Sequence, residues 1–431
     1  MAEVVLNTGD TAWVLASTAL VLLMTPGLAL FYGGMVRAKS VLNMMLMSMI
    51  TIGIVSVLWV IYGFKLAFGY KDNSQWYGEF SLSGLGSAVN ELTNNGGVYP
   101  IPLLAFAAFQ LMFAIITPAL ISGAIADRTK FTAWAVFVTV WSTLVYFPVA
   151  HWVFAFGNKV GDTVTGAGFL AARGVEDFAG GTAVHINAGA AGLALAIVLG
   201  RRIGWRKESM RPHSMPLVLV GAGLLWFGWF GFNAGSALSA GTIATVAFVA
   251  TNTSAAAAAL MWLILETNLR GKPTAVGAAT GAVAGLVGIT PAAGFVTPLA
   301  AILIGFITSF VCFYAVSLKH KLNVDDALDT YPIHGVGGTI GAVLTAIFAT
   351  TEVNSGGKDG VLRGNFGELF VELGAIAIAY VIAAVGTWLI LKFISATIGL
   401  RVKEEAEDQG LDVYEHGEEG YNSEFSDRIN T

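Results

Sequence analysis

Two histidines lie in apolar stretches of this sequence, where their side chains could do chemistry. His185 lies in a run from 178 to 200 that contains no Asp, Glu, Lys or Arg, and His334 lies in a second such run, 330–351. An ionisable group inside hydrocarbon needs a partner, and such groups commonly mark the path of an ion or a proton. A neutral imidazole offers one donor and one acceptor nitrogen, so a pair could relay a proton. The structural alternative is two separate hydrogen bonds between helices.

The composition indicates which elements must position these histidines. Only 12% of the 431 residues are charged, 55% are hydrophobic and the mean hydropathy is +0.71, whereas a soluble domain is roughly 25% charged. The pattern therefore predicts an all-α polytopic membrane protein. A spanning helix needs about 20 residues, so the two longest charge-free stretches are read as two passes each, which gives eleven transmembrane helices. The stretches are 11–36, 40–64, 92–126, 131–158, 178–200, 212–265, 273–318, 330–351 and 373–391.

The basic residues predict the orientation of the chain in the cell (cytoplasmic) membrane. Eleven spans place the termini on opposite faces, and with the N-terminus outside, sixteen basic residues face the cytoplasm and six face outward, as the positive-inside rule requires. Residues 1–403 form the predicted transmembrane domain. Residues 404–431 form a cytoplasmic tail with ten acidic residues and one basic residue. A charge block of this kind is either a solvated disordered end or an interaction segment.

Two pairs of segments predict an internal duplication. "ITPALISG" (116–123) lies in the third predicted span and "ITPAAGFV" (289–296) follows the eighth, while His185 lies in the fifth span and His334 in the tenth. This register predicts two five-helix repeats of inverted topology, plus a final long helix, with a site where the repeats meet. His185 lies about 12 Å beyond Asp177 at helical rise, so the two imidazoles are expected to converge near the middle of the membrane.

Asp177 stands at the mouth of the fifth predicted span. An Asp at this position is a good N-cap, which would accept hydrogen bonds from backbone N–H groups around Ala179 and Gly180. A fixed negative charge that favours a cation in an outer vestibule is compatible with capping. We expect the capping role to dominate, so that any effect of Asp177 on a substrate is indirect.

Five segments together resemble the ammonium transporter family, of the bacterial Amt type related to the yeast and Rhesus proteins. They are "AFQLMFAIITPALISGAIADR" (108–128), "DFAGGTAVHINAG" (177–189), "GWFGFNAGSA" (228–237), "PIHGVGG" (332–338) and "GLDVYEHGEEGY" (410–421). The resemblance implies a homotrimer in the lipid membrane with one pore through each subunit. It implies a transporter of ammonium or ammonia rather than an enzyme, with no cofactor, no metal and no nucleic-acid partner.

The resemblance also implies roles for individual residues along the pore. His185 and His334 are similar to the twin pore histidines of the family. Phe109 and Phe113, four residues apart and therefore on one helix face, resemble the pair of phenylalanines at the outer mouth, and Phe232 resembles a second ring of the gate. The apolar lumen beyond them would exclude a bare cation, because a cation loses its hydration there, whereas neutral ammonia would pass.

An external recruitment site for ammonium is implied by the same resemblance. Ser236 resembles its hydroxyl acceptor, and Phe113 with a second aromatic side chain could attract the cation through cation–π contacts of roughly 0.5–2 kcal/mol each. Where the family usually has a tryptophan at this site, the sequence places Phe154, with Trp152 two residues earlier on a different helix face. Either aromatic residue could complete the site.

The resemblance implies a trimeric PII-type nitrogen regulator as a partner, docked on the basic loops 201–211 and 319–321 and on the tail. Two other functions remain open. One is an ammonium sensor that signals through a partner, because no kinase or cyclase domain follows residue 403. The other is a membrane redox protein in which the two histidines ligate a haem b. The glycines form no "GxxxxGK[ST]" loop, which argues against ATP-driven pumping.

Overall fold

The computed structural model describes residues 5–69, 74–82, 84–93, 99–160 and 163–421. Within these residues, ten helical segments are long and apolar enough to cross a membrane. An eleventh apolar helix, α10 (Ala275–Ile289), has 15 residues. The ten long segments are α1 (Thr8–Met35), Ala38–Phe68, Leu103–Ile125, Phe131–Phe154, Gly181–Leu199, α8 (Met215–Gly235), α9 (Thr242–Arg270), α11 (Pro298–Leu322), Tyr331–Phe348 and α13 (Phe366–Thr397).

Five of these segments contain a change of helix type. Their α-helical parts are α2 (Val41–Leu58), α3 (Phe64–Phe68), α4 (Leu103–Ile121), α5 (Phe131–Trp141), α6 (Phe147–Phe154), α7 (Asn187–Leu199) and α12 (Gly337–Phe348). Two π-helical turns begin the segments that carry the histidines, η7 (Gly181–Ile186) and η8 (Tyr331–Val336). Rare π-helical turns concentrate at functional sites.

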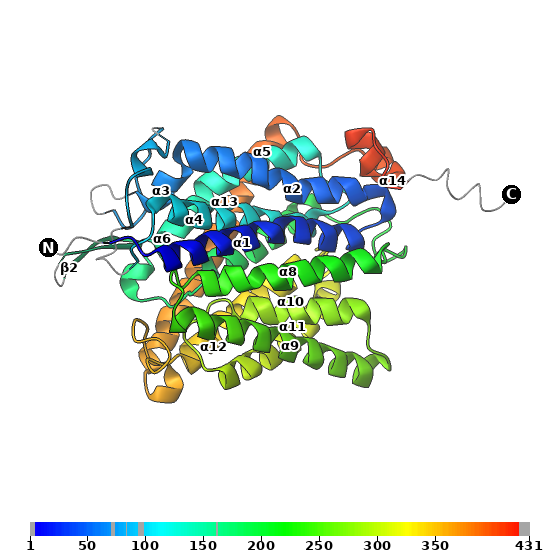
Figure 1. Ribbon diagram of the computed structural model, residues 1–431. Coiled ribbons are helices and arrows are strands. Elements are labelled where there is room, and N and C mark those ends of the chain that lie inside the picture. The colour runs from blue at the N-terminus through cyan, green and yellow to red at the C-terminus, as the bar shows by residue number, and fades with distance from the viewer. Residues whose placement is uncertain (1–4, 70–73, 83, 94–98, 161–162, 422–431) are drawn as a thin grey trace.

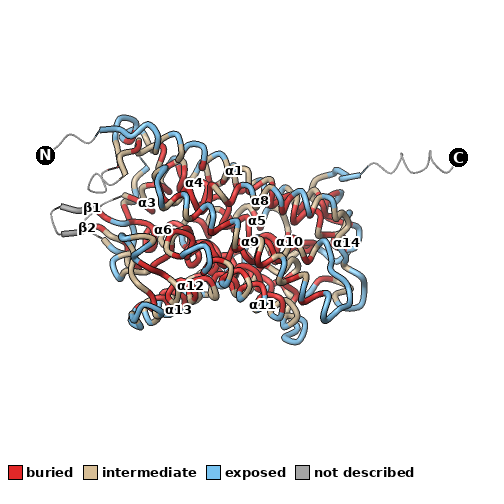
Figure 2. Tube along the Cα trace, turned by 60° about the horizontal axis from the view of Figure 1, so that its bottom comes forward, coloured by how far each residue is buried: buried red, intermediate tan, exposed pale blue. Residues whose placement is uncertain are grey.

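The helices lie side by side in one bundle with two ends (Figure 1). We call the end where α1 begins the N-face, and the end that carries the short helix α14 (Glu404–Gln409) the C-face. Buried residues fill the centre of the bundle, and exposed residues line its outside and both ends (Figure 2). The beginning of α1 and α14 therefore lie on opposite faces, as an odd number of crossings requires.

Small residues let α1 and α8 pack closely. A Cβ atom on Gly221 would lie 2.3 Å from the backbone nitrogen of Phe31, and one on Gly34 would lie 2.7 Å from the backbone oxygen of Ser214. Without a hydrophobic driving force between helices in lipid, such close backbone approach is the main source of helix association. The glycines of these two helices are therefore packing residues.

The structure corrects three details of the predicted elements. The fifth span begins at Gly181 instead of 178, because Gly180 has a φ of 119° and its backbone leaves the helix. The last span extends over Phe366–Thr397 and includes Glu372 and Lys392, which bounded the predicted stretch 373–391. A β-hairpin of β1 (Phe156–Val160) and β2 (Thr163–Ala167) stands on the N-face, which the all-α expectation missed.

Contacts between the two halves are reciprocal. The N–H of Phe178, just before the fifth span, donates to Pro291 O after the eighth, at 3.1 Å. The N–H of Leu328, just before the tenth span, donates to Gly123 O at the end of the third, at 3.0 Å. These are the contacts that an inverted five-plus-five duplication would make, and the duplication stays our interpretation of the sequence.

The described part of the tail, residues 404–421, packs on the C-face of its own chain. The carboxylate of Asp412 accepts hydrogen bonds from the N–H groups of Leu42 and Asn43 at the start of α2, at 3.0 and 2.8 Å. Arg401 pairs with Glu407 at 2.7 Å. The tail thus supplies a cap that α2 lacks within its own sequence.

Candidate functional site

The two histidines meet inside the bundle. Their Nδ1 atoms are 3.2 Å apart and their rings are nearly parallel, with centroids 5.3 Å apart and an angle of 16° between the planes. His185 and His334 are 1% and 3% exposed. The expected convergence is confirmed. Because one Nδ1 must donate and the other accept, the pair shares a single proton at this contact.

Asp177 holds the start of the helix that carries His185. Its Oδ1 accepts from the N–H groups of Gly180 and Gly181 at 2.7 and 2.5 Å, and its Oδ2 accepts from the Thr182 N–H at 2.8 Å and the Ala183 N–H at 3.2 Å. The Thr182 hydroxyl also donates to Oδ2. Gly180 is one of the two expected donors, and the other N–H donors lie one to three residues beyond it, because the helix begins later. Capping itself is confirmed.

A second aspartate does the same for His334, and we did not single it out from the sequence. Asp326 accepts from the N–H groups of Thr330 and Tyr331 at 3.1 and 2.7 Å. Burial raises the pKa of this carboxyl to about 6, although Lys319 opposes the rise. Both aspartates stand eight residues before their histidine, and this shared spacing could have identified Asp326.

Three phenylalanines form a cluster between the N-face and the histidines. The ring centroids of Phe113 and Phe232 are 4.3 Å apart, and those of Phe109 and Phe113 are 5.0 Å apart. Phe232 also stacks on His185, with centroids 6.0 Å apart. The three rings therefore lie together beside the imidazoles, and their role as a gate stays a prediction.

A small cavity of about 20 Å³ lies on the N-face side of this cluster. Ser236 and Phe154 line it with Phe109 and Phe113, and its remaining lining residues are Gln110, Phe156, Phe178 and Leu238. The Ser236 hydroxyl donates to Phe232 O at 2.7 Å. A cavity of this size holds about one water-sized molecule.

Trp152 does not reach this cavity. Its indole N–H donates to Trp76 O at 2.7 Å, and its ring packs edge-on against Trp76 and lies beside Phe169. Phe154, in contrast, lies 6.3 Å from Phe113 between ring centroids. Of the two aromatic residues left open by the sequence, only Phe154 is placed where it could contact a guest in the cavity.

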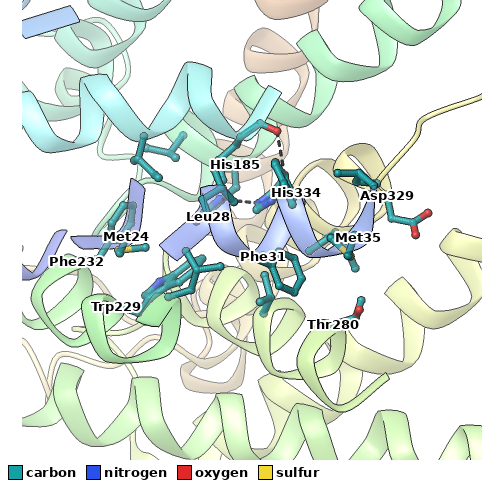
Figure 3. Close-up of a pocket in the computed structure, with 18 of the residues that line it drawn as sticks. Met24, Leu28, Phe31, Met35, His185, Trp229, Phe232, Thr280, Asp329 and His334 are labelled. Carbon is teal, nitrogen blue, oxygen red and sulfur yellow. Dashed lines mark hydrogen bonds between the residues drawn. The ribbon is translucent and has the colours of Figure 1, made fainter. Parts of the chain in front are cut away.

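A second cavity, of about 70 Å³, lies beside the histidines. Figure 3 shows it between Phe232 and Trp229 at one end and Asp329 and Thr280 at the other, with His334 at its centre. Its wall is otherwise apolar, including Met24, Leu28, Phe31 and Met35. Pockets that hold drug-sized ligands have a volume of about 300 Å³ or more. The cavity and the direct contact between the rings therefore leave no room for a haem between these two histidines.

The ten apolar segments define a multi-pass membrane protein, which holds the two cavities and the histidine pair inside its bundle. The sequence model of a family described as "Ammonium Transporter Family" matches residues 12–421 of this chain. The protein named "Ammonium transporter" from Mycobacterium tuberculosis (strain ATCC 25618 / H37Rv) is 49% identical over an alignment of 433 residues. The alignment covers 96% of this chain and 90% of the relative. This chain belongs to the ammonium transporter family.

Two solved structures share the fold. The crystal structure of Saccharomyces cerevisiae Mep2 matches with a TM-score of 0.82 and 34% identity, covering 93% of this chain and 91% of that chain. A structure described as "Sensor Amt Protein" matches with a TM-score of 0.83 and 28% identity, covering 95% of this chain and 98% of that chain. The likeness extends over almost the whole bundle.

The cap made by Asp177 leads to a stability prediction. Asp177→Asn replaces one acceptor oxygen by an amide group that cannot accept, and buried N–H groups lose their partner. We expect a loss of about 1–3 kcal/mol in the free energy of unfolding, measured by thermal unfolding of the purified protein. Asp359→Asn is the matched control, because Asp359 also accepts from a backbone N–H, that of Thr351, but at an exposed site. Equal losses in both variants would contradict the role of the buried cap.

Proposed function

We propose that this protein transports ammonium or ammonia across the cell membrane, with the N-face outside and the C-face in the cytoplasm. The observation that carries the proposal is the contact between His185 and His334 in an apolar cavity behind the phenylalanine cluster. Membership of the ammonium transporter family and the names of the relatives support it. The protein acts as a homotrimer with one pore in each subunit.

Ammonium is first recruited in the cavity of about 20 Å³ on the N-face. Phe113 and Phe154 attract the cation by cation–π contacts of roughly 0.5–2 kcal/mol each. Ser236 donates its proton to Phe232 O, so its oxygen lone pairs are free to accept from an N–H of ammonium. Potassium has no N–H to donate and gains less at this site. Asp177 contributes indirectly, by holding the segment that carries Phe178 in the cavity wall.

The phenylalanine cluster then separates ammonia from the cation. The Phe113 and Phe232 rings, with centroids 4.3 Å apart, must move aside for any guest to pass. A cation that enters the apolar cavity beyond them loses its hydration at a cost of many kcal/mol, whereas neutral ammonia does not. Ammonium therefore gives up its proton to water on the N-face side of the cluster, and Phe109, Phe113 and Phe232 act as the gate.

The imidazole pair offers ammonia polar partners at the centre of a cavity whose lining is mostly apolar. With one proton shared between the Nδ1 atoms, one ring presents an N–H at Nε2 and the other a bare nitrogen. His185 Nε2 has no hydrogen-bond partner among the described residues. Ammonia can both donate and accept, so the pair suits it, and the shared proton gives a relay between the two rings.

A sensor is the second candidate function, because a structure described as "Sensor Amt Protein" has the same fold. A sensor could use the same recruitment cavity and change the docking of the tail without passing its ligand. Ammonium-induced current distinguishes the two, since a sensor that does not transport gives none.

The histidine pair is tested by His185→Ala, His334→Ala and the double variant. We expect each single variant to reduce ammonium-induced current in proteoliposomes at least about tenfold, corresponding to about 1.4 kcal/mol or more, and the double variant to add little, because the residues act as one unit. The space left by a truncated ring admits water, so potassium exclusion should also weaken. His320→Ala, an exposed histidine at the end of α11, is the control. Wild-type current and potassium exclusion in both single variants would make the pair structural only.

The docked tail gives a second functional prediction. Truncation after Lys403 and the point variant Asp412→Ala both remove the cap on α2, so both should lower ammonium uptake while size-exclusion chromatography still gives the trimer. Glu419→Ala, at an exposed position of the same tail, is the control and should leave uptake unchanged. Unaltered uptake in the truncated protein would indicate a merely solvating tail, and dissociated subunits would indicate a role in assembly.

We also propose that a trimeric PII-type regulator docks on the C-face. The predicted basic loops lie side by side, since Arg201 Nε donates to Asn323 O at 3.3 Å and the Trp205 ring stacks on His320 with centroids 6.0 Å apart. Lys207→Glu should weaken co-purification of the cognate PII protein at least about tenfold, because it reverses a charge at an electrostatic interface. Lys272→Glu, exposed at the turn between α9 and α10, should not. Failure of the wild type to co-purify under every nucleotide condition would contradict the partnership.

A further inference from the structure

Three glutamates are buried together on the N-face, outside the pathway described above. Glu176 precedes Asp177, and Glu368 and Glu372 lie one turn apart on α13. They are 5%, 2% and 0% exposed. Lys358 Nζ lies 3.0 Å from a carboxylate oxygen of Glu368 and also donates to Gly174 O at 2.9 Å. These side chains therefore join the segment before the fifth span to the loop of Lys358 and to α13, both far later in the sequence.

Each glutamate has one oxygen with a donor and one without. Glu176 Oε1 accepts from the Lys358 N–H, Glu372 Oε1 accepts from the Glu176 N–H at 2.6 Å, and Glu368 Oε2 accepts from Lys358 Nζ. The other oxygens, Glu176 Oε2, Glu368 Oε1 and Glu372 Oε2, are buried and have no partner among the described residues. A buried carboxylate oxygen without a donor costs several kcal/mol.

The charges around the cluster are unbalanced. Besides the three glutamates, the negative groups that face it are Asp177 and Asp359, and the positive group that contacts it is Lys358. Asp177 is compensated by its own five donors. Three carboxyl groups then share one ammonium group, which leaves the cluster short of positive charge and of hydrogen-bond donors at the same time.

We propose that Glu176, Glu368 and Glu372 form a proton-binding site on the N-face. A proton held between carboxyl groups removes one negative charge, and the resulting O–H is a donor for an oxygen that has none. A metal ion is a poorer occupant, since no group of three acidic, histidine or cysteine side chains among the described residues is arranged to hold one. The site is separate from the histidine pair and from the Asp177 cap.

Burial raises the pKa of Glu176 to about 7, although the Lys358 backbone N–H opposes the rise. The folded chain therefore binds a proton more tightly than the unfolded chain, whose glutamate has the ordinary pKa. The stability that this proton provides is complete below the ordinary pKa of about 4.5 and is lost as the pH rises through about 7. The segment before the fifth span, which supports His185, is thus held more weakly in alkaline medium.

The first experiment measures the pH dependence of stability. The thermal unfolding midpoint of the purified full chain is recorded from about pH 5 to about pH 8, across the range in which this proton is released. Glu372→Gln keeps the acceptor for the Glu176 N–H and replaces the unpartnered oxygen by a permanent amide donor. Glu352→Gln is the matched control, because Glu352 is an exposed glutamate on the same face. Other carboxyl groups titrate in all three proteins. The decisive quantity is therefore the difference in pH dependence between the wild type and the two variants.

We expect the midpoints of the wild type and of Glu352→Gln to fall together as the pH rises, and that of Glu372→Gln to fall less. The slopes of stability against pH should differ between the wild type and Glu372→Gln by nearly one bound proton. One proton corresponds to about a tenfold change in the unfolding equilibrium per pH unit. Equal slopes in all three proteins would overturn the proposal. If Glu372→Gln does not fold, Glu176→Gln replaces it, since its amide oxygen can still accept from Lys358.

Infrared spectroscopy tests the proton directly. The carbonyl stretch of a protonated carboxyl group should be present in the wild type and in Glu352→Gln near neutral pH, and it should be weakened in Glu372→Gln. Absence of the band from the wild type would overturn the proposal, as would stabilisation of the wild type by sodium at alkaline pH that Glu372→Gln lacks, because the site would then bind a cation. Neither measurement depends on ammonium transport, so failure here leaves the proposed function untouched.

Discussion

A polar group inside a lipid bilayer has no water to bond, and the arrangement of this protein depends on how that constraint is met at two helix starts. The fifth and tenth membrane segments begin within the protein, and their first N–H groups need acceptors. Asp177 and Asp326 supply them. The π-helical turns that follow bring His185 and His334 to a contact of 3.2 Å. The imidazole pair is possible because the first N–H groups of each histidine's helix already have aspartate acceptors.

The same constraint explains the polar structure of the C-face. Arg128 is fully buried, and its guanidinium donates to the backbone oxygens of Ala124, Ala126 and Asp325. Asp412 in the tail accepts the first N–H groups of α2. Through Asp325 O and through the start of α2, these two charged side chains bond to the backbone of segments far away in sequence. The tail is therefore part of the fold on this face, because it completes the start of α2.

The membrane segments could be predicted from the sequence because charge-free stretches of about 20 residues have few other uses. The ends of the membrane segments were harder to predict, since charged side chains can lie inside a helix when they have partners in the bundle. Glu372 bounded the predicted last span, whereas α13 begins before it, at Phe366, and also contains Glu368. The choice between Phe154 and Trp152 also required the structure, because the indole of Trp152 is held by Trp76 O. Asp326 could have been predicted, because it lies eight residues before its histidine, as Asp177 does.

Two neighbouring residues show how local donors decide what a buried carboxyl group can do. Asp177 is surrounded by N–H and O–H donors, which give both of its oxygens partners and hold it in the cap of the fifth span. Glu176, one position earlier, has a single backbone donor and faces two further glutamates. The shortage of donors makes its proton exchangeable near neutral pH. A carboxyl group with a full set of donors and one that lacks donors thus stand side by side, and the second is the one placed to bind a proton on the N-face.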